Sequence, residues 1–322
     1  MGFLSRLSDR LSDISPRVWK GVRVLAALLL VVMLLYYPVG MILAHRIDDN
    51  PDFLPPASET PEGASHAVAM AAALIDREVD VNGWVANDPF FLPGAALDNM
   101  PNYQQGIVAS LGRFAFELTD QIGRSRGSSA ADRDLQEAAG LLQYSGTKWV
   151  FDLSTSVMPT ASSEQQYRKA ARSLKAYNAR VARGEALFDR RGDNLQATLD
   201  RVANDLGNLS AQLDQQIRDN GGALIDTHGD DVFYRVKGQI YAYEMILKGL
   251  QKDFQAVIRD RNVTYQFDQL IQSLNEAAQL RPLVVMNGAP DAVMTPSHLA
   301  AEGFFLLRAR TQLREITSIL EK

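Results

Sequence analysis

An uncharged stretch near the N-terminus limits what this chain can fold into more than any other feature. From Val24 to Ala44 the sequence reads VLAALLLVVMLLYYPVGMILA, with no charged side chain among these 21 residues. At about 1.5 Å per residue, a helix of this length matches a bilayer core of about 30 Å. Because lipid offers no hydrogen-bond partners, a backbone that crosses it must satisfy its own amides. The stretch therefore predicts a transmembrane helix in contact with the lipid bilayer.

Two other structures can contain an apolar run of this kind. A buried core helix is usually shorter and has a polar face, which this run lacks. A cleaved signal peptide has a shorter apolar stretch and small residues before the cut, where this sequence has Ile42 and Ala44. We therefore expect an uncleaved anchor.

The charges that flank the apolar run predict its orientation. Five basic side chains precede it: Arg6, Arg10, Arg17, Lys20 and Arg23. Behind it, Arg46 is followed by a cluster of aspartates. Lysine and arginine beside a transmembrane helix stay on the cytoplasmic side. We expect a single-pass protein of the bacterial inner membrane, with a cytoplasmic N-terminus and its bulk in the periplasm.

The composition excludes several classes of function. The formal net charge is −5, whereas a nucleic-acid binder usually shows a strongly basic surface, so no nucleic-acid partner is expected. The chain has no cysteine, which excludes disulfides, thiolate nucleophiles and cysteine zinc sites. Nothing in the sequence predicts a cofactor or a metal ligand set.

The chain divides into four predicted segments. The region from Asn50 to Gly63 is rich in proline and acids, which is typical of an extended tether. The four segments are a cytoplasmic N-terminal segment at 1–23, the transmembrane helix at 24–44, a linker at 45–63 and an extracytoplasmic helical domain at 64–322.

Apolar side chains recur at helical spacing throughout the last segment. The clearest pattern is a heptad seam from Leu195 to Ile217, and a second seam runs from Val232 to Val257. A short turn at Gly221-Gly222 separates them, so the two helices should pack antiparallel. Further helices are predicted at 64–79, 103–122, 132–144, 164–183, 266–280 and 297–320. We expect an all-α bundle with long antiparallel helices and long ordered loops, in which the seams pack internally; a coiled-coil dimer is the alternative.

Three long connections carry large apolar side chains. They are Gly83–Asn102, Ser145–Ser163 and Arg281–Ser297. Long loops without secondary structure are uncommon in compact domains and usually have a function when they are ordered. They could plug the ends of the bundle, line a groove for a partner, or dip into the membrane. We favour the plug, then the groove, and place the membrane last.

The first of these loops, GWVANDPFFLPGAALDNMPNYQQG, resembles a signature of an uncharacterised proteobacterial group, the DUF2333 family. The matching residues are Gly83, Asn87-Asp88, Asp98-Asn99-Met100-Pro101, Tyr103 and Gly106; Trp84 and Tyr103 depart slightly from the usual pattern. The second loop and the helix after it resemble the family less sharply. The resemblance implies a short cytoplasmic start, one anchor helix and a helical exterior, and it implies no activity.

The first loop also holds the polar residues best placed for chemistry. Asp88, Asp98 and Asn99 are expected to lie near each other, where carboxylates can bind a cation or act as acid and base. They can equally cap helices, and Asn102 fits a cap for a helix beginning at Tyr103. We favour capping, and no catalytic, cofactor-binding or metal-binding residue is assigned.

The function best supported by the sequence is that of an envelope scaffold or interaction protein, with another envelope protein or a second copy as partner. An enzyme is less expected, because no catalytic motif is present. The alternative is a hydrolase or ligand-binding protein for cell-wall or lipid material that uses the loop around Asp88 and Asp98. The candidate interaction residues are Trp84, Asn87, Asp88, Phe90, Phe91, Asp98, Asn99, Met100, Pro101, Tyr103, Trp149 and Phe151.

Overall fold

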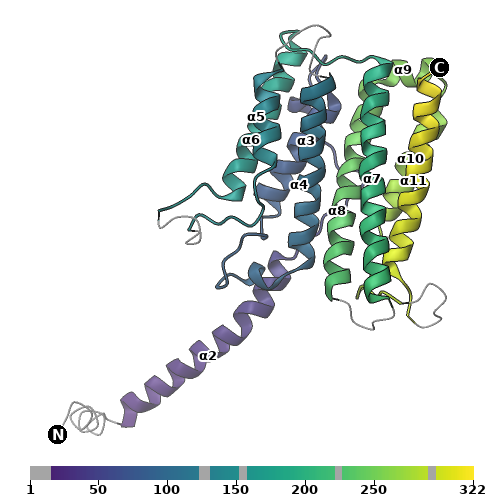
Figure 1. The fold of residues 1–322 in the computed structure, drawn as a ribbon. Coiled ribbons are helices and arrows are strands. Elements are labelled where there is room, and N and C mark those ends of the chain that lie inside the picture. Colours follow the sequence, from purple (N-terminus) through teal and green to yellow (C-terminus); the bar gives the residue numbers. More distant parts are fainter. Residues whose placement is uncertain (1–15, 123–130, 152–157, 222–226, 289–294) are drawn as a thin grey trace.

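A computed structural model describes residues 16–122, 131–151, 158–221, 227–288 and 295–322 (Figure 1). Within these residues every regular element is a helix, apart from an isolated bridge between Asn287 and Ser297. The predicted all-α fold is therefore confirmed. Its long helices are α2 (Pro16–Ala44), α3 (His66–Asp76), α4 (Asn99–Glu117), α5 (Arg133–Leu142), α6 (Ser163–Ala182), α7 (Gly192–Asn220), α8 (Thr227–Asp253), α10 (Thr264–Ala278) and α11 (His298–Leu320).

Shorter helical turns complete the described structure. Two of them extend longer helices as π-turns, η2 after α3 and η4 after α4. The others are 3-10 turns in the connections and one short α-helix. Their bounds are η1 Ala57–Glu59, η2 Arg77–Val81, η3 Pro93–Ala96, η4 Leu118–Ile122 and α9 Gln255–Asp260.

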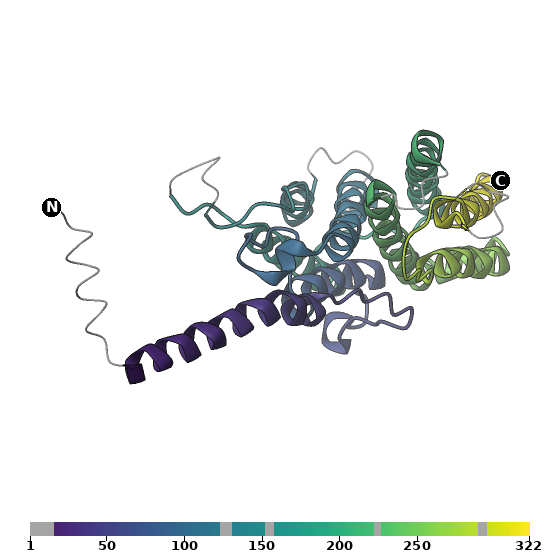
Figure 2. The same ribbon diagram turned by 90° about the horizontal axis from the view of Figure 1, so that it is seen from below.

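Helix α2 stands away from the rest of the molecule (Figures 1 and 2). In the described residues it is the one helix long and apolar enough to cross a membrane, with a mean hydropathy of 2.4 in its most apolar stretch. None of that stretch is buried against the body. Its length and composition match the predicted anchor.

The remaining helices form two groups that share one core. Helices α3, α4, α5 and α6 lie on one side, and α7, α8, α10 and α11 lie on the other (Figure 1). Helix α8 joins the groups because it packs along α4 and α3 as well as α10 and α7. The α4–α8 crossing is close: a Cβ atom on Gly238 would lie 2.1 Å from the carbonyl oxygen of Tyr103, and one on Gly106 would lie 2.2 Å from that of Arg235. Only glycine allows the two backbones to meet in this way.

The first heptad seam forms α7, whereas the second is divided between α8 and, at Val257, the short helix α9, and the main partners of both differ from the prediction. Helix α7 packs chiefly on α11, and α8 packs chiefly on α4, whereas the α7–α8 contact is smaller. The reason is that α8 is buried on several sides, so one stripe does not describe its surroundings. The seam leucines of α7, such as Leu199 and Leu206, are fully buried within this one chain. Internal packing therefore accounts for the α7 seam.

The segment after α2 differs from the free tether that its composition predicts. The hydroxyl of Tyr103 donates to the carbonyl oxygen of Asp48 at 2.8 Å, and that of Tyr241 donates to the carbonyl oxygen of Asn50 at 2.8 Å. Asp49 is only 4% exposed. The beginning of the predicted linker is thus bound to the helical body, while the predicted segment boundaries remain a prediction.

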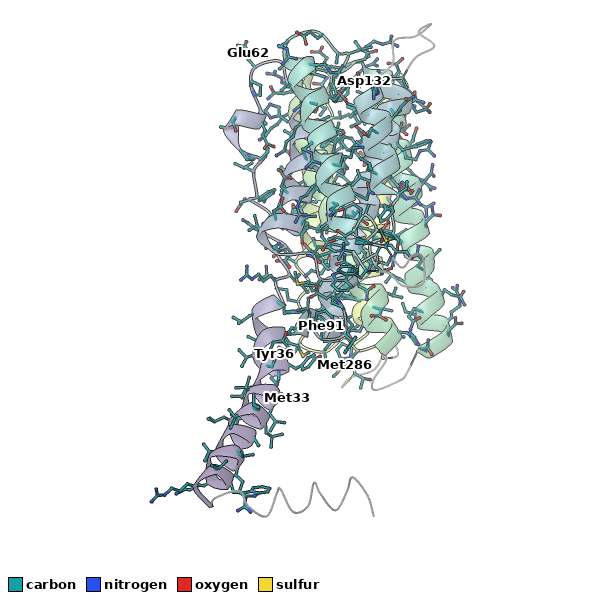
Figure 3. The ribbon with its side chains drawn as sticks, turned by 90° about the vertical axis from the view of Figure 1, so that its left-hand side faces the viewer. Met33, Tyr36, Glu62, Phe91, Asp132 and Met286 are labelled. Atoms are coloured by element: carbon teal, nitrogen blue, oxygen red, sulfur yellow. The ribbon has the colours of Figure 1, made fainter. Side chains whose placement is uncertain are left out.

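The two ends of the body are distinct. We call the end from which α2 leaves the anchor end and the opposite end the far end. Figure 3 shows Phe91 and Met286 at the anchor end, next to Tyr36 of α2, and Glu62 and Asp132 at the far end. All three apolar loops join helices at the anchor end, because α4, α6 and α11 begin there.

Candidate functional site

The first and second apolar loops are joined by hydrogen bonds. Trp84 is buried, and its indole nitrogen donates to the carbonyl oxygen of Gly146 at 2.8 Å. Its ring packs edge-to-face on Tyr167, with 4.9 Å between centroids. The side-chain amide of Asn87 donates to the carbonyl oxygen of Lys148 at 2.8 Å. Trp84 therefore fills the end of the bundle, as the plug interpretation predicts.

Asp88 lies in a partly buried position beside Glu164. Burial, with a further contribution from the Glu164 charge, raises the pKa of Asp88 to about 6. A Cβ atom on Gly94 would lie 2.0 Å from the Oδ2 atom of Asp88, so the carboxyl packs directly against the glycine backbone and leaves no room for a larger side chain. Glu164 itself accepts from Asn87 Nδ2 at 2.7 Å. The Asn87–Glu164 bond therefore links the first loop to α6.

Asp98 has a different role and different neighbours. Its Oδ1 atom accepts from the Asn99 amide at 2.8 Å and caps α4. Asn102 lies inside the helix and donates to Asp231 Oδ1 at 2.6 Å, so the predicted Asn102 cap is wrong. The helix begins earlier than predicted because Pro101 sits in its first turn, where a missing amide hydrogen leaves no helix bond unmade.

The carboxylates at this end fall into two groups. Asp88 interacts with Glu164, whereas Asp98 faces Asp230 and Asp231 at the start of α8. Burial raises the pKa of Asp230 to about 6, and the negative charges of Asp98 and Asp231 contribute to the same shift. In the described part of the chain, no cluster of three or more His, Asp or Glu side chains could hold a metal ion. Nothing in this arrangement supports the hydrolase alternative.

The start of α4 is held by the contacts of four candidate residues, namely Asn99, Met100, Pro101 and Tyr103. With its side-chain amide suitably turned, Asn99 donates to Asp230 Oδ2 at 2.8 Å. Met100 is fully buried, and its sulfur accepts from the Arg46 amide at 3.0 Å. The carbonyl oxygen of Pro101 accepts from Gln105 Nε2 at 3.1 Å within the same helix. The first turn of α4 therefore holds both the segment behind α2 and the start of α8.

Four aromatic side chains form an uninterrupted row on the surface of the anchor end. We call Phe90, Phe91, Trp149 and Phe151 the aromatic row. Neighbouring ring centroids are 5.5, 5.7 and 5.4 Å apart. Phe90 is 84% exposed and Phe151 is 53% exposed. The plug interpretation is wrong for the three phenylalanines, which are exposed, whereas Trp149 is half-buried between Phe91 and Phe151.

A buried ion pair, which the sequence did not reveal, fastens the segment behind α2. Lys237 of α8 is 1% exposed and donates to Asp49 Oδ2 at 2.8 Å and to the Leu280 carbonyl oxygen at 2.6 Å. Arg281 also pairs with Asp49. Together, the two cations lower the pKa of Asp49 against the opposing effect of burial. The only sign of this pair in the sequence was Lys237 itself, a charged residue within the apolar stripe of α8.

A buried glutamate lies in the same region. Both carboxylate oxygens of Glu302 are buried and have no hydrogen-bond partner among the described residues. Burial raises the pKa of Glu302 well above its usual value, although the charge of Lys237 opposes this shift. The neutral acid is therefore the favoured form.

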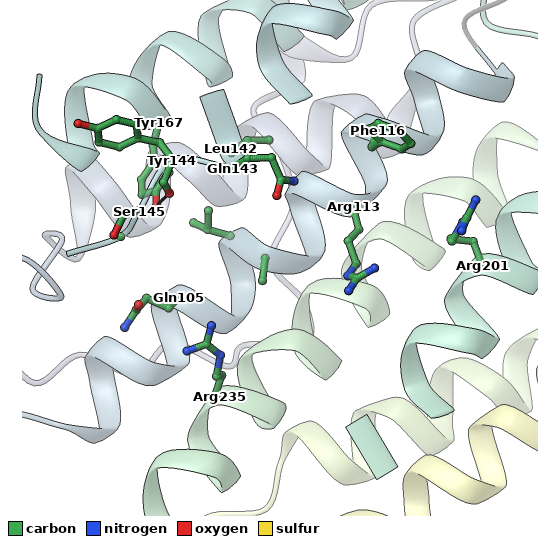
Figure 4. Close-up of a pocket in the computed structure, with 13 residues that line it drawn as sticks. Gln105, Arg113, Phe116, Leu142, Gln143, Tyr144, Ser145, Tyr167, Arg201 and Arg235 are labelled. Atoms are coloured by element: carbon green, nitrogen blue, oxygen red, sulfur yellow. Dashed lines mark hydrogen bonds between the residues drawn. The ribbon is translucent and has the colours of Figure 1, made fainter. Parts of the chain in front are cut away.

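A groove runs across the surface between the two helix groups. Its volume is about 710 Å³, and its walls come from α4, α5, α6, α7, α8 and the turn after α5 (Figure 4). Arg113 in this groove pairs with Asp205 at 3.0 Å. Arg235, which also lines it, makes no ion pair with any described residue. The sequence did not predict this groove, because its lining comes from five helices and a turn with no shared motif.

Comparison with known proteins agrees with the sequence resemblance. No curated protein and no solved structure matches the chain. The DUF2333 family, described as an uncharacterized protein conserved in bacteria, matches residues 18–228 and 225–322. These two matches cover nearly the whole chain, including α2 and the helical body. The protein therefore belongs to the bacterial DUF2333 family.

Proposed function

We propose that this protein is a membrane-anchored scaffold of the bacterial envelope, which presents a binding groove at a fixed distance from the inner membrane. The observation that carries the proposal is the attachment of the body to its anchor. The buried Asp49–Lys237 pair follows α2 by only a few residues. A body held in this way has a defined height and orientation, whereas a flexibly linked one does not.

The charge pattern around α2 supports a cytoplasmic N-terminus and a periplasmic body. Arg17, Lys20 and Arg23 lie in the first turns of α2, and acidic residues follow its end. Alkaline phosphatase fused after Lys322 should be active, because the enzyme needs the oxidising periplasm. Green fluorescent protein exported to the same place should be dark. The reverse pattern would place the body in the cytoplasm and contradict the proposal.

The groove has the chemistry to bind an acidic partner segment that also carries an apolar residue. Arg113, Arg201 and Arg235 all line it, and Phe116 lies among them, largely exposed. Arg113 and Arg201 already contact carboxylates of the chain, but Arg235 does not among the described residues. An exposed aromatic ring surrounded by arginines is typical of protein interfaces.

Cysteine crosslinking tests the groove directly, because the natural chain has no cysteine. A benzophenone maleimide on Gln143→Cys, in the groove wall, should give one crosslinked product in cell membranes. Adding Arg235→Glu should abolish the product, whereas Arg235→Lys should keep it, since lysine retains the charge. The matched control is Gln272→Cys on the exposed face of α10.

Three outcomes of this experiment discriminate between partners. A product of defined mass that depends on the charge of Arg235 supports an acidic protein partner. A product of twice the chain mass identifies a second copy as the occupant and replaces the partner proposal. The absence of a product, or a product that survives charge reversal, contradicts binding in the groove.

A further inference from the structure

The aromatic row is attached to α2 well inside its apolar stretch. The hydroxyl of Tyr36 donates to the carbonyl oxygen of Phe91 at 3.1 Å, and that of Tyr37 donates to the carbonyl oxygen of Phe90 at 2.5 Å. Four residues further along α2, a Cβ atom on Gly40 would lie 2.2 Å from Cγ of Pro93. The loop thus lies against the apolar helix itself, before the helix ends.

The position of these contacts along α2 sets the depth of the loop. Tyr36 follows Arg23 by thirteen residues and precedes Arg46 by ten. At about 1.5 Å per residue, it lies about 20 Å beyond Arg23 and about 15 Å before Arg46 along the helix axis. Even at a tilt of about 40°, the contact stays about 11 Å below Arg46. With these arginines at the two interfaces of a core of about 30 Å, the loop reaches the apolar layer.

The loop also has the composition that such a position requires. From residue 89 to residue 97 it reads PFFLPGAAL, without a charged side chain. Its backbone forms turns of its own, with amide-to-carbonyl bonds from Leu92 to Pro89 at 2.8 Å and from Leu97 to Gly94 at 3.0 Å. Unpaired backbone groups are costly at membrane depth, and these bonds, together with the contact of the loop with α2, reduce that cost. The tyrosine hydroxyls of α2 donate hydrogen bonds to two further carbonyl oxygens of this loop, so the hydroxyls also have partners at this depth.

We propose that the aromatic row and the turn at 89–97 insert into the membrane leaflet on the body side. The occupant of this surface is lipid, that is, the acyl chains of that leaflet. Phenylalanine and tryptophan gain free energy by leaving water for this region. The insertion gives the protein a second lipid contact beside α2, which fixes the tilt of the body on the membrane. The proposal rests on α2 crossing the membrane and does not depend on the groove.

Depth-dependent quenching tests this insertion in the full chain. Phe90→Cys carries an NBD fluorophore in vesicles of phosphatidylethanolamine and phosphatidylglycerol at a ratio of three to one. Lipids with a nitroxide on the acyl chain should quench it at least threefold more than NBD on Tyr265→Cys. Tyr265 is a matched control because it is an exposed aromatic residue in the first turn of α10, directly after α9, which lies at the far end in Figure 1. Equal quenching at both sites would overturn the proposal.

Two further measurements separate the remaining explanations. NBD on Leu30→Cys, in the middle of α2, reports the span itself and should be quenched by nitroxides on the acyl chains. If that probe is quenched but Phe90→Cys is not, the loop proposal fails while the anchor stands. If Phe90→Cys is shielded from an impermeant maleimide in cells but not quenched by lipid, a protein covers the row, and the proposal also fails. Phe90 is exposed, so its substitution should leave the fold intact.

Discussion

The two ends of the helical body use the same helices but present opposite surfaces. At the far end the turns carry paired charges, such as Arg183 with Glu185 and Arg191 with Asp193. At the anchor end the turns expose Phe90 and Leu283, and the nearest charged residues in sequence are Asp88 and Arg281. This asymmetry is what the proposed insertion of the aromatic row into lipid predicts, because only the anchor end would then leave water.

The two ends also use their buried carboxylates differently. At the far end Asp253 of α8 accepts from Ser65 Oγ at 2.7 Å, from the His66 amide at 2.7 Å and from the Ala67 amide at 3.0 Å. It therefore caps α3 from another helix. At the anchor end Asp49 neutralises Lys237, a buried cation. Loss of Asp253 would leave the hydroxyl and amide dipoles at the start of α3 without an acceptor. Loss of Asp49 would leave the buried charge of Lys237 without its partner. Removing a carboxylate should therefore lower the stability more at the anchor end.

The largest effect is expected for Asp49→Ala. Lys237 is almost completely buried and would lose its counter-charge. Breaking a buried ion pair on one side costs about 3–5 kcal/mol of the free energy of unfolding. Urea unfolding of the full chain in detergent, followed by the fluorescence of the buried Trp84, measures this loss.

Two variants control for this measurement. Asp52→Ala removes an exposed carboxylate three residues away and should change the stability by less than about 0.5 kcal/mol. Adding Lys237→Met to Asp49→Ala should restore most of the loss, because no charge then remains buried. A double variant as unstable as the single one would show that packing, and not charge, sets the sensitivity of this end.

A smaller loss is expected at the far end from Asp253→Ala. The Ser65 hydroxyl and two amides at the start of α3 would lose their acceptor, which costs about 2 kcal/mol. Asp253→Asn keeps one carbonyl oxygen and should lose less. The same urea unfolding measures both variants. If Asp253→Ala is as damaging as Asp49→Ala, the distinction between the two ends is wrong.

The helices of both groups could be predicted from the sequence because apolar periodicity records which face is buried. Leu199 and Leu206 lie where their spacing predicts, and Ser297 caps α11 through the Ala300 amide at 3.2 Å. The choice of partner helix could not be predicted in the same way. Helix α8 is buried on several sides, so its side-chain pattern does not indicate that its closest neighbour is α4.

The candidate site was harder to predict because backbone groups make much of it. The carbonyl oxygens of Asp48 and Phe91 accept from tyrosine hydroxyls, and any residue could supply them. The proline-rich segment after α2 therefore resembled a free tether. Asp88 and Asp98 share one loop in sequence, yet Asp98 faces α8 while Asp88 faces Glu164. Closeness in sequence did not indicate shared surroundings.

The titration of Asp88 should give a still smaller effect, confined to the anchor end. Its folded pKa of about 6 lies above the usual value of about 4 for an unfolded chain, so the folded state holds the proton more tightly. The stability that the protonated Asp88 contributes is fully present below pH 4 and is lost as the pH rises through 6. Because Asp88 is partly exposed, water should limit the change to less than about 1 kcal/mol.

Asp88→Asn provides the matched comparison for this titration. The amide does not titrate. Between pH 4 and pH 7 the natural chain should therefore lose stability relative to the variant. Urea unfolding at half-unit pH steps measures the slope. A difference that stays flat across this range would mean that the carboxyl is solvated in the folded chain. Asp230 has a similar pKa and remains in both proteins, so its contribution cancels.

The smallest change in stability is expected for the residues that distinguish the two ends most clearly. Phe90→Ser and Tyr265→Ser each remove an exposed aromatic ring, one at each end, and neither should alter the free energy of unfolding in detergent by more than about 0.5 kcal/mol. Their effects should diverge only in a bilayer. There, Phe90→Ser removes apolar area from lipid and should increase the motion of the body relative to α2, seen as lower steady-state anisotropy of a fluorophore on Gln272→Cys. Tyr265→Ser should leave the anisotropy unchanged, because that ring contacts water in either medium. Equal anisotropy for both variants in vesicles would mean that lipid does not distinguish the two ends, and their asymmetry would then need a protein partner at the anchor end.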